Sequence, residues 1–234
     1  MYSLVTLGPL RMSTYGLCLI AATFIWWTWT ERTLLKKNIP LADWVMPSLI
    51  VVAWLGGRLG VILTEPDTMT DVFSQLITIR IFEYTWWTAV VLSGLLLWRL
   101  LPSTYGLILQ HMSIPLLVAY GIATLGATVG GTAIGTSTTL PWGIESYGDV
   151  RHPVGAYEAL IVWVGALWLV QRQRAGESIG WAAISVFAAQ ELLCGGFRLN
   201  GWVIGGGLHI TQLLGLVTLI VAHERVIMTN HKQT

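Results

Sequence analysis

Charged side chains inside apolar stretches are the first candidates for chemistry in this sequence, because a charge there is costly unless it has a partner. Glu191 and Arg198 stand seven residues apart near the end of one apolar stretch, and Arg58 interrupts another. An ion pair between Glu191 and Arg198 would satisfy both groups, whereas an unpaired Glu191 would indicate a reaction or binding site. Arg58 is expected to pair with Glu191 or with an acidic residue of an outer loop.

A second polar group begins at Arg151, His152 and Pro153 and continues with Tyr157 and Glu158. Proline is favoured at the first position of a helix, and an acidic residue is stabilised near the positive end of the helix dipole. We therefore expect a helix to start at Pro153. The polar side chains around it would then tie the preceding loop to the first turns of that helix.

The composition describes the surroundings in which these groups must sit. The chain has 234 residues, of which 54% are hydrophobic and 11% charged, with a mean hydropathy of +0.66. Soluble domains carry about twice this charged fraction. Long apolar stretches of this kind belong in a bilayer, where helices satisfy their own backbone hydrogen bonds. The net charge of +1, without a basic block, argues against nucleic acid as a partner.

Seven apolar stretches predict seven membrane-spanning helices, so the fold class is an all-α integral membrane protein with one domain, 1–234. The predicted spans are residues 14–29, 45–63, 84–98, 114–134, 154–170, 179–193 and 208–222. The polar connectors 65–83 and 135–153 carry opposite charges, which predicts that they pack on each other. The fourth stretch is rich in small residues, which allow close approach between helices.

The orientation follows from the distribution of lysine and arginine, which are enriched in cytoplasmic loops. With the N-terminus outside, eight of these residues fall inside and four outside. The inner set is Arg32, Lys36, Lys37, Arg99, Arg172, Arg174, Arg225 and Lys232, and the outer set is Arg11, Arg80, Arg151 and Arg198. We therefore predict an outside N-terminus and an inside C-terminus.

Single cysteines and histidines do not form a metal-ligand pattern in this sequence. Cys18 and Cys194 lie in apolar stretches and are expected to be packed thiols. His209 and His223 lie at span ends, where an interfacial position is expected. Neither a metal nor a cofactor is predicted.

Several motifs resemble those of the prolipoprotein diacylglyceryl transferase family, and they occur in the order found in that family. Residues 8–17 are similar to its opening G-P-x-x-I-x-W-Y-G-L, a match that includes Tyr15. Residues 140–143 and 151–160 resemble L-P-W-G followed by R-H-P-x-Q-L-Y-E-A. Residues 207–214 resemble the closing G-L-T-x-x-Q-x-L, and residues 57–60 add a weaker match.

The resemblance implies a seven-helix bacterial cytoplasmic membrane protein with a lipid cavity open to the bilayer. The family transfers the diacylglyceryl group of phosphatidylglycerol to the thiol of a lipobox cysteine. This chemistry needs cations that hold the glycerol phosphate and a base that activates the thiol. The lipid-binding candidates are Tyr15, Arg58, Arg151, His152, Tyr157, Glu158, Glu191 and Arg198; the catalytic residues are left unassigned.

The chain departs from the family at its signature stretch, G-R-x-G-N-F-x-N-G-E. Without gaps, the arginine of this motif falls on Thr124, the asparagines on Ala127 and Gly130, and the glutamate on Thr132. No arginine lies between residues 101 and 150, so a shifted alignment does not restore it.

Two further family positions are also changed. The histidine of the family's H-G-G-x-x-G segment falls on Ala89, with Gly94 retained. The family's R-F-x-x-E-x-x-R is reduced to Phe197 and Arg198, with Glu191 at the place of its first arginine.

These departures favour a catalytically degenerate homologue, a pseudoenzyme that binds phospholipid or serves as a structural subunit of a membrane complex. The alternative is an active phosphatidylglycerol–prolipoprotein diacylglyceryl transferase with a site rebuilt from Arg58, Arg151, Arg198 and Glu191. The expected partner in either case is a membrane phospholipid resembling phosphatidylglycerol, with other membrane subunits as further candidates.

Overall fold

The computed structural model describes residues 4–7, 10–39, 41–64, 86–146, 148–199, 203–204 and 207–231. The chain divides into two compact units. The larger unit consists of Met1–Arg32 and Leu109–Thr234, and the smaller unit consists of Thr33–Ile108. Each unit is described by itself below.

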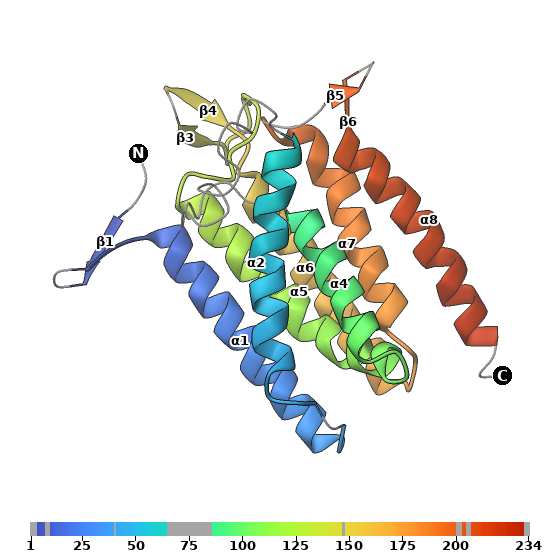
Figure 1. Ribbon diagram of the computed structural model, residues 1–234. Coiled ribbons are helices and arrows are strands. Elements are labelled where there is room, and N and C mark those ends of the chain that lie inside the picture. Colours follow the sequence, from blue (N-terminus) through green and yellow to red (C-terminus); the bar gives the residue numbers. More distant parts are fainter. Residues whose placement is uncertain are drawn as a thin grey trace. The chain divides into compact units, whose positions relative to one another are not determined.

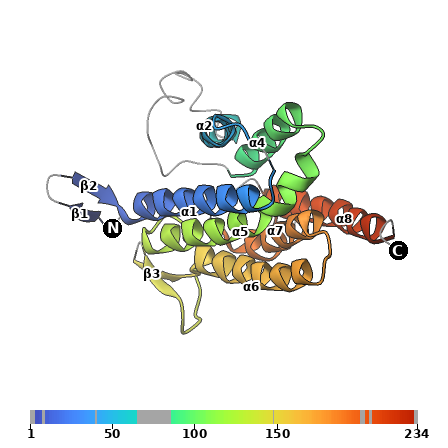
Figure 2. The same cartoon turned by 90° about the horizontal axis from the view of Figure 1, so that it is seen from below.

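The larger unit is a bundle of long helices (Figures 1 and 2). Its helices are α1 (Thr14–Lys36), α5 (Tyr105–Val129), α6 (Val154–Arg174), α7 (Gly180–Cys194) and α8 (Ile210–His231), of which α1 and α5 also extend into the smaller unit. Helix α7 packs between α6 and α8. The bundle core comes from α5, α6 and the start of α7, where branched aliphatic side chains pack together with alanines.

Glycines in α5 allow its neighbours to approach closely, as the dense small residues of this stretch predict. A Cβ added at Gly126 would lie 2.2 Å from the Cβ of Cys18 on α1. A Cβ at Gly121 would lie 2.2 Å from Nε1 of Trp163 on α6. Both contacts leave no room for a side chain, so packing explains these small residues.

Helix α5 differs from the predicted span 114–134 at both ends. It begins earlier than predicted, at Tyr105. The prediction started too late because Gln110 and His111 lower the hydropathy of the first turns, although they do not interrupt the helix. It ends at Val129, where Gly131 adopts φ +76°. The amides of Gly131 and Thr132 donate to Thr128 and Ala127, which is the hydrogen-bond pattern of a Schellman cap.

Three short hairpins complete the larger unit at the ends of its helices. They pair β1 (Leu4–Leu7) with β2 (Leu10–Ser13), β3 (Ile144–Ser146) with β4 (Asp149–Arg151), and β5 (Val203–Ile204) with β6 (Leu208–His209). The second hairpin lies within connector 135–153, for which the sequence predicted only a loop. A 3₁₀ turn, η2 (Gly195–Phe197), follows α7.

The smaller unit contains α2 (Val45–Thr64) packed against α4 (Trp86–Leu100). A Cβ added at Gly56 would lie 3.2 Å from the Cα of Ala89, so these backbones nearly touch. Ala89 is 5% exposed at this contact. A histidine at this position, as in the family motif, would not fit between the two helices.

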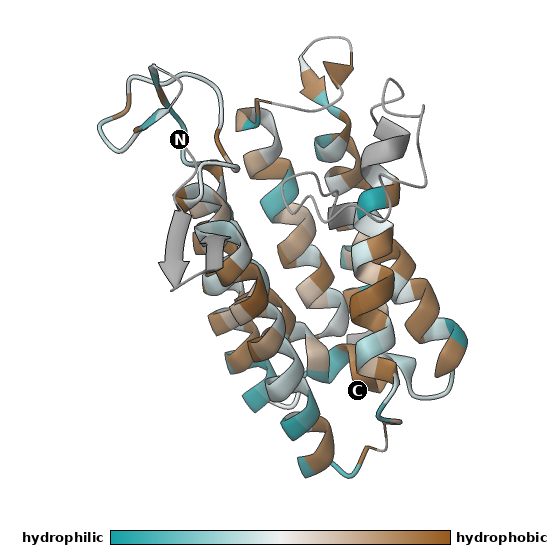
Figure 3. Cartoon of the chain, turned by 60° about the vertical axis from the view of Figure 1, so that its left-hand side comes forward, coloured by the Kyte–Doolittle hydropathy of each residue, from teal (hydrophilic) through white to brown (hydrophobic). Residues whose placement is uncertain are grey.

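Each of the seven predicted spans overlaps a helix of the described residues. Among the residues that the structure describes, three helices are long and apolar enough to cross a membrane: Tyr105–Val129, Val154–Arg174 and Gly180–Phe197. Val45–Gly60 and Thr88–Leu100 are shorter apolar helices. Figure 3 shows apolar residues along much of the helices. The number of spans and their orientation stay predictions, and the proposed packing of connector 65–83 lies outside the described residues.

Candidate functional site

Arg198 binds two glutamates from different helices. Its Nη2 lies 2.6 Å from Oε1 of Glu158 on α6 and 2.6 Å from Oε1 of Glu191 on α7. Its Nε donates to Glu158 over 3.0 Å, and its Nη1 donates to Oε2 of Glu191 over 3.0 Å. The two carboxylates are 5% and 2% exposed, whereas the arginine is 22% exposed. The predicted ion pair between Glu191 and Arg198 is therefore confirmed.

We name Glu158, Glu191 and Arg198 the carboxylate–arginine cluster. The cluster contains two acidic groups and one basic group, so one carboxylate is in excess. Burial alone would lower the pKa of Arg198, but Glu158 and Glu191 hold that pKa above its ordinary value. The guanidinium therefore stays charged beside the two carboxylates.

Two neutral side chains extend the cluster. Tyr120 of α5 donates from its hydroxyl to Oε2 of Glu158 over 3.4 Å. Gln190 donates to Oε1 of Glu191 over 3.3 Å, while its own Oε1 is buried and has no hydrogen-bond partner among the described residues. A buried acceptor of this kind is a place where a donor group of a water or a ligand can bind.

An extended segment, 135–138, holds the backbone around the cluster. The amide of Thr136 donates to Phe197 on one side, and the amide of His152 donates to Thr136 on the other. A Cβ added at Gly135 would lie 2.4 Å from the carbonyl oxygen of Phe197 and 2.9 Å from the Cβ of His152. Gly135 is therefore required for this close approach, which places Arg198 and the start of α6 side by side.

The polar residues that precede α6 form a second group beside this segment. The hydroxyl of Tyr157 accepts from Nε1 of Trp142 over 2.8 Å and lies 3.2 Å from Nδ1 of His152. The His152 ring lies 4.8 Å from that of Phe197, between ring centroids. The predicted connection between this loop and the start of α6 is confirmed, and Pro153 directly precedes the helix.

Arg151 is fixed by backbone oxygens at the same end of the unit. Its Nε donates to Ser146 over 3.3 Å and its Nη1 to Gly135 over 3.4 Å, while Asp149 is 3.9 Å away. A hydrogen bond from Ser137 is the main reason that the pKa of Asp149 is lowered, helped by the amide of Val150 and by Arg151.

The positions that align with the family's signature stretch lie where α5 contacts α6 and at the C-terminal end of α5. The hydroxyls of Thr124 and Thr128 donate to carbonyls of their own helix, those of Tyr120 and Thr124. A Cβ added at Gly155 of α6 would lie 2.3 Å from the carbonyl oxygen of Thr124. Thr132 donates to Ala127 at the end of the helix. These side chains supply no cation to the cluster.

The remaining candidates lie elsewhere. Tyr15 packs against Gly130, whose added Cβ would lie 3.0 Å from that of Tyr15. Arg58 is 4% exposed within α2 of the smaller unit. Glu191, one partner considered for Arg58, is instead bound by Arg198.

Sequence reasoning missed the pairing of Glu158 with Arg198, which are forty residues apart. It also missed the contributions of Tyr120, Gln190 and Trp142. The sequence did contain a signal for Glu158, because an acidic residue one turn inside an apolar helix is unusual. Its favourable interaction with the helix dipole, however, already explained this position without a partner.

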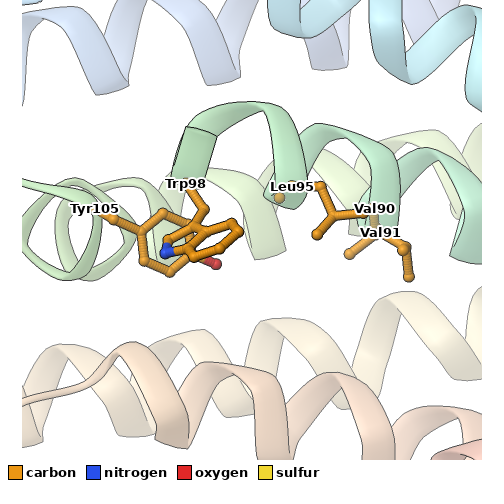
Figure 4. A pocket seen from close by; sticks show the side chains of 6 residues that line it. Val90, Val91, Leu95, Trp98 and Tyr105 are labelled. Atoms are coloured by element: carbon orange, nitrogen blue, oxygen red, sulfur yellow. The ribbon is translucent and has the colours of Figure 1, made fainter. Parts of the chain in front are cut away.

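A shallow groove of about 300 Å³ lies on α4 in the smaller unit (Figure 4). Its lining is apolar except for the Tyr105 hydroxyl and the Trp98 indole. Gly94, retained from the family motif, lies in this groove. The groove suits an apolar chain and contains no acid or base with which to react.

The family model of prolipoprotein diacylglyceryl transferase matches residues 3–228. The chain is 27% identical over 213 residues to the phosphatidylglycerol–prolipoprotein diacylglyceryl transferase of Tropheryma whipplei (strain TW08/27), covering 81% of this chain and 75% of that protein. The transferase of the same name from Geobacter sulfurreducens is 26% identical over 255 residues, covering 97% and 94%. That of Wolbachia pipientis is 25% identical over 242 residues, covering 92% and 90%.

Proposed function

The chain belongs to the prolipoprotein diacylglyceryl transferase family, and we propose that it is an active phosphatidylglycerol–prolipoprotein diacylglyceryl transferase of the bacterial cytoplasmic membrane. The names of the curated relatives support this activity. The sequence favoured a catalytically degenerate homologue. The family match and the charged cluster in the larger unit favour its alternative, an active enzyme with a rebuilt site.

The proposed reaction exchanges one bond for another at a glycerol carbon. The sulfur of the prolipoprotein cysteine attacks the terminal carbon of the diacylglyceryl group, and a C–S thioether bond forms. The bond from that carbon to a phosphate oxygen breaks, and glycerol phosphate departs with the bonding electron pair. The thiol loses its proton to a base, so the reaction needs no oxidant or reductant.

The excess carboxylate of the carboxylate–arginine cluster is the single observation that carries this proposal. Glu158 and Glu191 share one guanidinium, and both are nearly inaccessible to solvent. Two carboxylates held this close to one cation can accept one proton without leaving the cation unpaired. A proton taken from a thiol therefore has a destination, and Arg198 keeps the protonated cluster electrically neutral.

Arg151 and Arg198 are the cations best placed for a departing phosphate. Both belong to the backbone segments that flank residues 135–138, and both side chains are partly accessible, at 17% and 22%. Arg151 uses only long contacts, of 3.3 to 3.9 Å, so a phosphate oxygen can compete for its donors. Preorganised cations of this kind stabilise charge that develops in a transition state.

The second candidate is a lipid-binding subunit without turnover. One observation favours it: Thr124, Ala127 and Thr132 stand at family motif positions and serve only helix packing and helix termination. In this case the carboxylate–arginine cluster joins α6 to α7 and does not exchange protons with a substrate.

The deciding experiment incubates the purified full-length protein with phosphatidylglycerol and a lipobox peptide and follows the peptide mass. An active enzyme adds one diacylglyceryl group, and a peptide with serine in place of cysteine stays unmodified. Glu191→Gln and Glu158→Gln should each reduce turnover by about 100-fold or more. Glu145→Gln, an exposed glutamate on β3, is the matched control and should leave turnover unchanged. Bound lipid without any modified peptide would support the second candidate instead.

A further inference from the structure

A second cavity lies in the larger unit, at the end of α6 that is opposite the carboxylate–arginine cluster. It has a volume of about 590 Å³ and is lined by α6, α7 and the C-terminal half of α8. Glu158 and Arg172 are fourteen residues apart on α6, which corresponds to about 21 Å along a helix. The two places are therefore near opposite faces of a hydrocarbon core that is about 30 Å thick.

The wall of this cavity is apolar and its rim is charged. Trp168, Leu219 and Ile220 line the wall, and Trp168 and Ile220 are 40% and 57% exposed. Arg172, His223 and Glu224 lie at the rim, in the last turns of α6 and α8. An apolar wall below a charged rim matches a lipid molecule, with its acyl chain in the groove and its headgroup at the helix ends.

Arg172 is oriented by its neighbours before any ligand binds. Its guanidinium lies 4.9 Å from the ring centroid of Trp168, and its Nε donates to Glu177 over 2.6 Å. Its Nη2 also pairs with Glu177, which leaves the Nη1 donors without an acceptor in the described part of the chain. Those donors are available to a phosphate oxygen.

Glu224 supplies the opposite charge at the same rim. Its carboxylate is exposed and makes no ion pair or hydrogen bond within the residues that the structure describes. A purely anionic headgroup would meet repulsion from this carboxylate, since Glu177 already neutralises Arg172. A headgroup with both a phosphate and an ammonium group would satisfy Arg172 and Glu224 together.

We propose that this cavity is a binding site for one zwitterionic phospholipid with a primary-amine headgroup, of the phosphatidylethanolamine kind. The phosphate binds Nη1 of Arg172, the ammonium binds Glu224, and an acyl chain lies along Trp168 and Ile220. The site depends on the α6–α8 cavity alone and does not require the proposed transferase activity.

Native mass spectrometry of the purified full-length protein tests this site with three lipids of identical acyl chains. These are phosphatidylethanolamine, phosphatidylglycerol and phosphatidylcholine, which has no N–H donor. The protein should retain one molecule of phosphatidylethanolamine about fivefold better than either of the others, because phosphatidylglycerol lacks the ammonium group and phosphatidylcholine lacks the N–H donors of a charge-assisted hydrogen bond to Glu224. Equal retention of the three lipids, or stronger retention of phosphatidylglycerol, would overturn the proposal.

Matched variants assign the binding to this rim. Glu224→Gln should remove the preference for phosphatidylethanolamine, and Arg172→Gln should weaken its retention, whereas Arg174→Gln, two residues further along α6, should change neither. Ile220→Trp should block the cavity, while Ile20→Trp on α1, at a residue that is 56% exposed and so closely matches the 57% of Ile220, should not. The site is refuted if Glu224→Gln and Ile220→Trp both bind like the unaltered protein.

Discussion

The two ends of α6 hold charged residues in opposite ways. At the end that includes Glu158, the charges of the carboxylate–arginine cluster are paired with N–O distances of 2.6 to 3.0 Å. At the other end, Arg172 and Glu224 lie beside an open cavity, and Glu224 has no partner within the described part of the chain. We call the first the closed end, because its charges are paired with one another, and the second the open end, because its cavity carries a carboxylate without a partner in the described part of the chain.

The difference between the two ends shows why buried and exposed charged residues must be interpreted differently. A buried pair is costly to form and even more costly to break, because removal of one partner leaves an uncompensated charge. An exposed ion pair contributes little to stability and is free to change partners. Variants of the closed end should therefore alter stability and turnover together, and variants of the open end should alter lipid binding alone.

The largest effect is expected when the cation of the closed end is removed. Arg198→Met leaves Glu158 and Glu191 buried without a counter-charge, which should cost about 3–5 kcal/mol of unfolding free energy. Thermal unfolding in detergent measures this loss, with Arg174→Met as the control at the open end. A triple variant that adds Glu158→Gln and Glu191→Gln should recover most of the stability. A loss as small as that of Arg174→Met would contradict the closed-cluster description.

A backbone contact at the closed end should give the next largest effect. Gly135→Ala places a Cβ 2.4 Å from the carbonyl oxygen of Phe197, so the segment must shift, at a cost of about 1–3 kcal/mol. The control is Gly106→Ala in α5, where an added Cβ meets no heavy atom within 4 Å. That change should be neutral or stabilise the helix by up to about 1 kcal/mol. Chemical denaturation of both variants compares them, and equal stabilities would refute the close approach.

The open end should respond much less to the loss of an ion pair. Glu177→Gln removes the partner of a partly exposed arginine and should change the unfolding free energy by less than about 1 kcal/mol. The remaining difference from the unaltered protein should diminish further at high salt, because exposed charges are screened. Unfolding midpoints at low and high ionic strength test this. A loss comparable to that of Arg198→Met would remove the contrast between the two ends.

The helices could be predicted from the sequence because apolar length alone specifies them. Each of the seven predicted stretches contains a helix, and Glu191 and Arg198 could be paired because they are close in sequence. The predicted end of α5 was wrong. The apolar pattern continues to Ile134, whereas the cap at Gly131 ends the helix earlier. Hydropathy does not register a backbone conformation of this kind.

The remainder of the site depends on contacts between distant residues. The pairing of Glu158 with Arg198 requires the register of residues 135–138 between two other segments, which no local pattern encodes. The cavity beside Arg172 likewise depends on how α8 packs on α6 and α7. The orientation of the chain in the membrane, by contrast, stays a prediction from charge counts, which reporter fusions at Thr234 would test.

The smallest expected effect concerns Asp149, which lies at the closed end but is exposed. Its pKa lies below the ordinary value of 3.8, chiefly because Ser137 donates to it. A carboxyl group whose folded pKa is lowered adds stability above its unfolded pKa and loses that contribution as the pH falls through the folded value. Ser137→Ala should therefore reduce the unfolding midpoint slightly at neutral pH, and the difference should disappear in acid, once the pH has fallen below the lowered pKa of Asp149. Unfolding midpoints of both proteins across this pH range measure the difference. Because Asp149 is solvent-exposed, the effect should be far smaller than that of Arg198→Met. A difference that persists unchanged in acid would mean that Ser137 acts through packing and not through the Asp149 carboxylate.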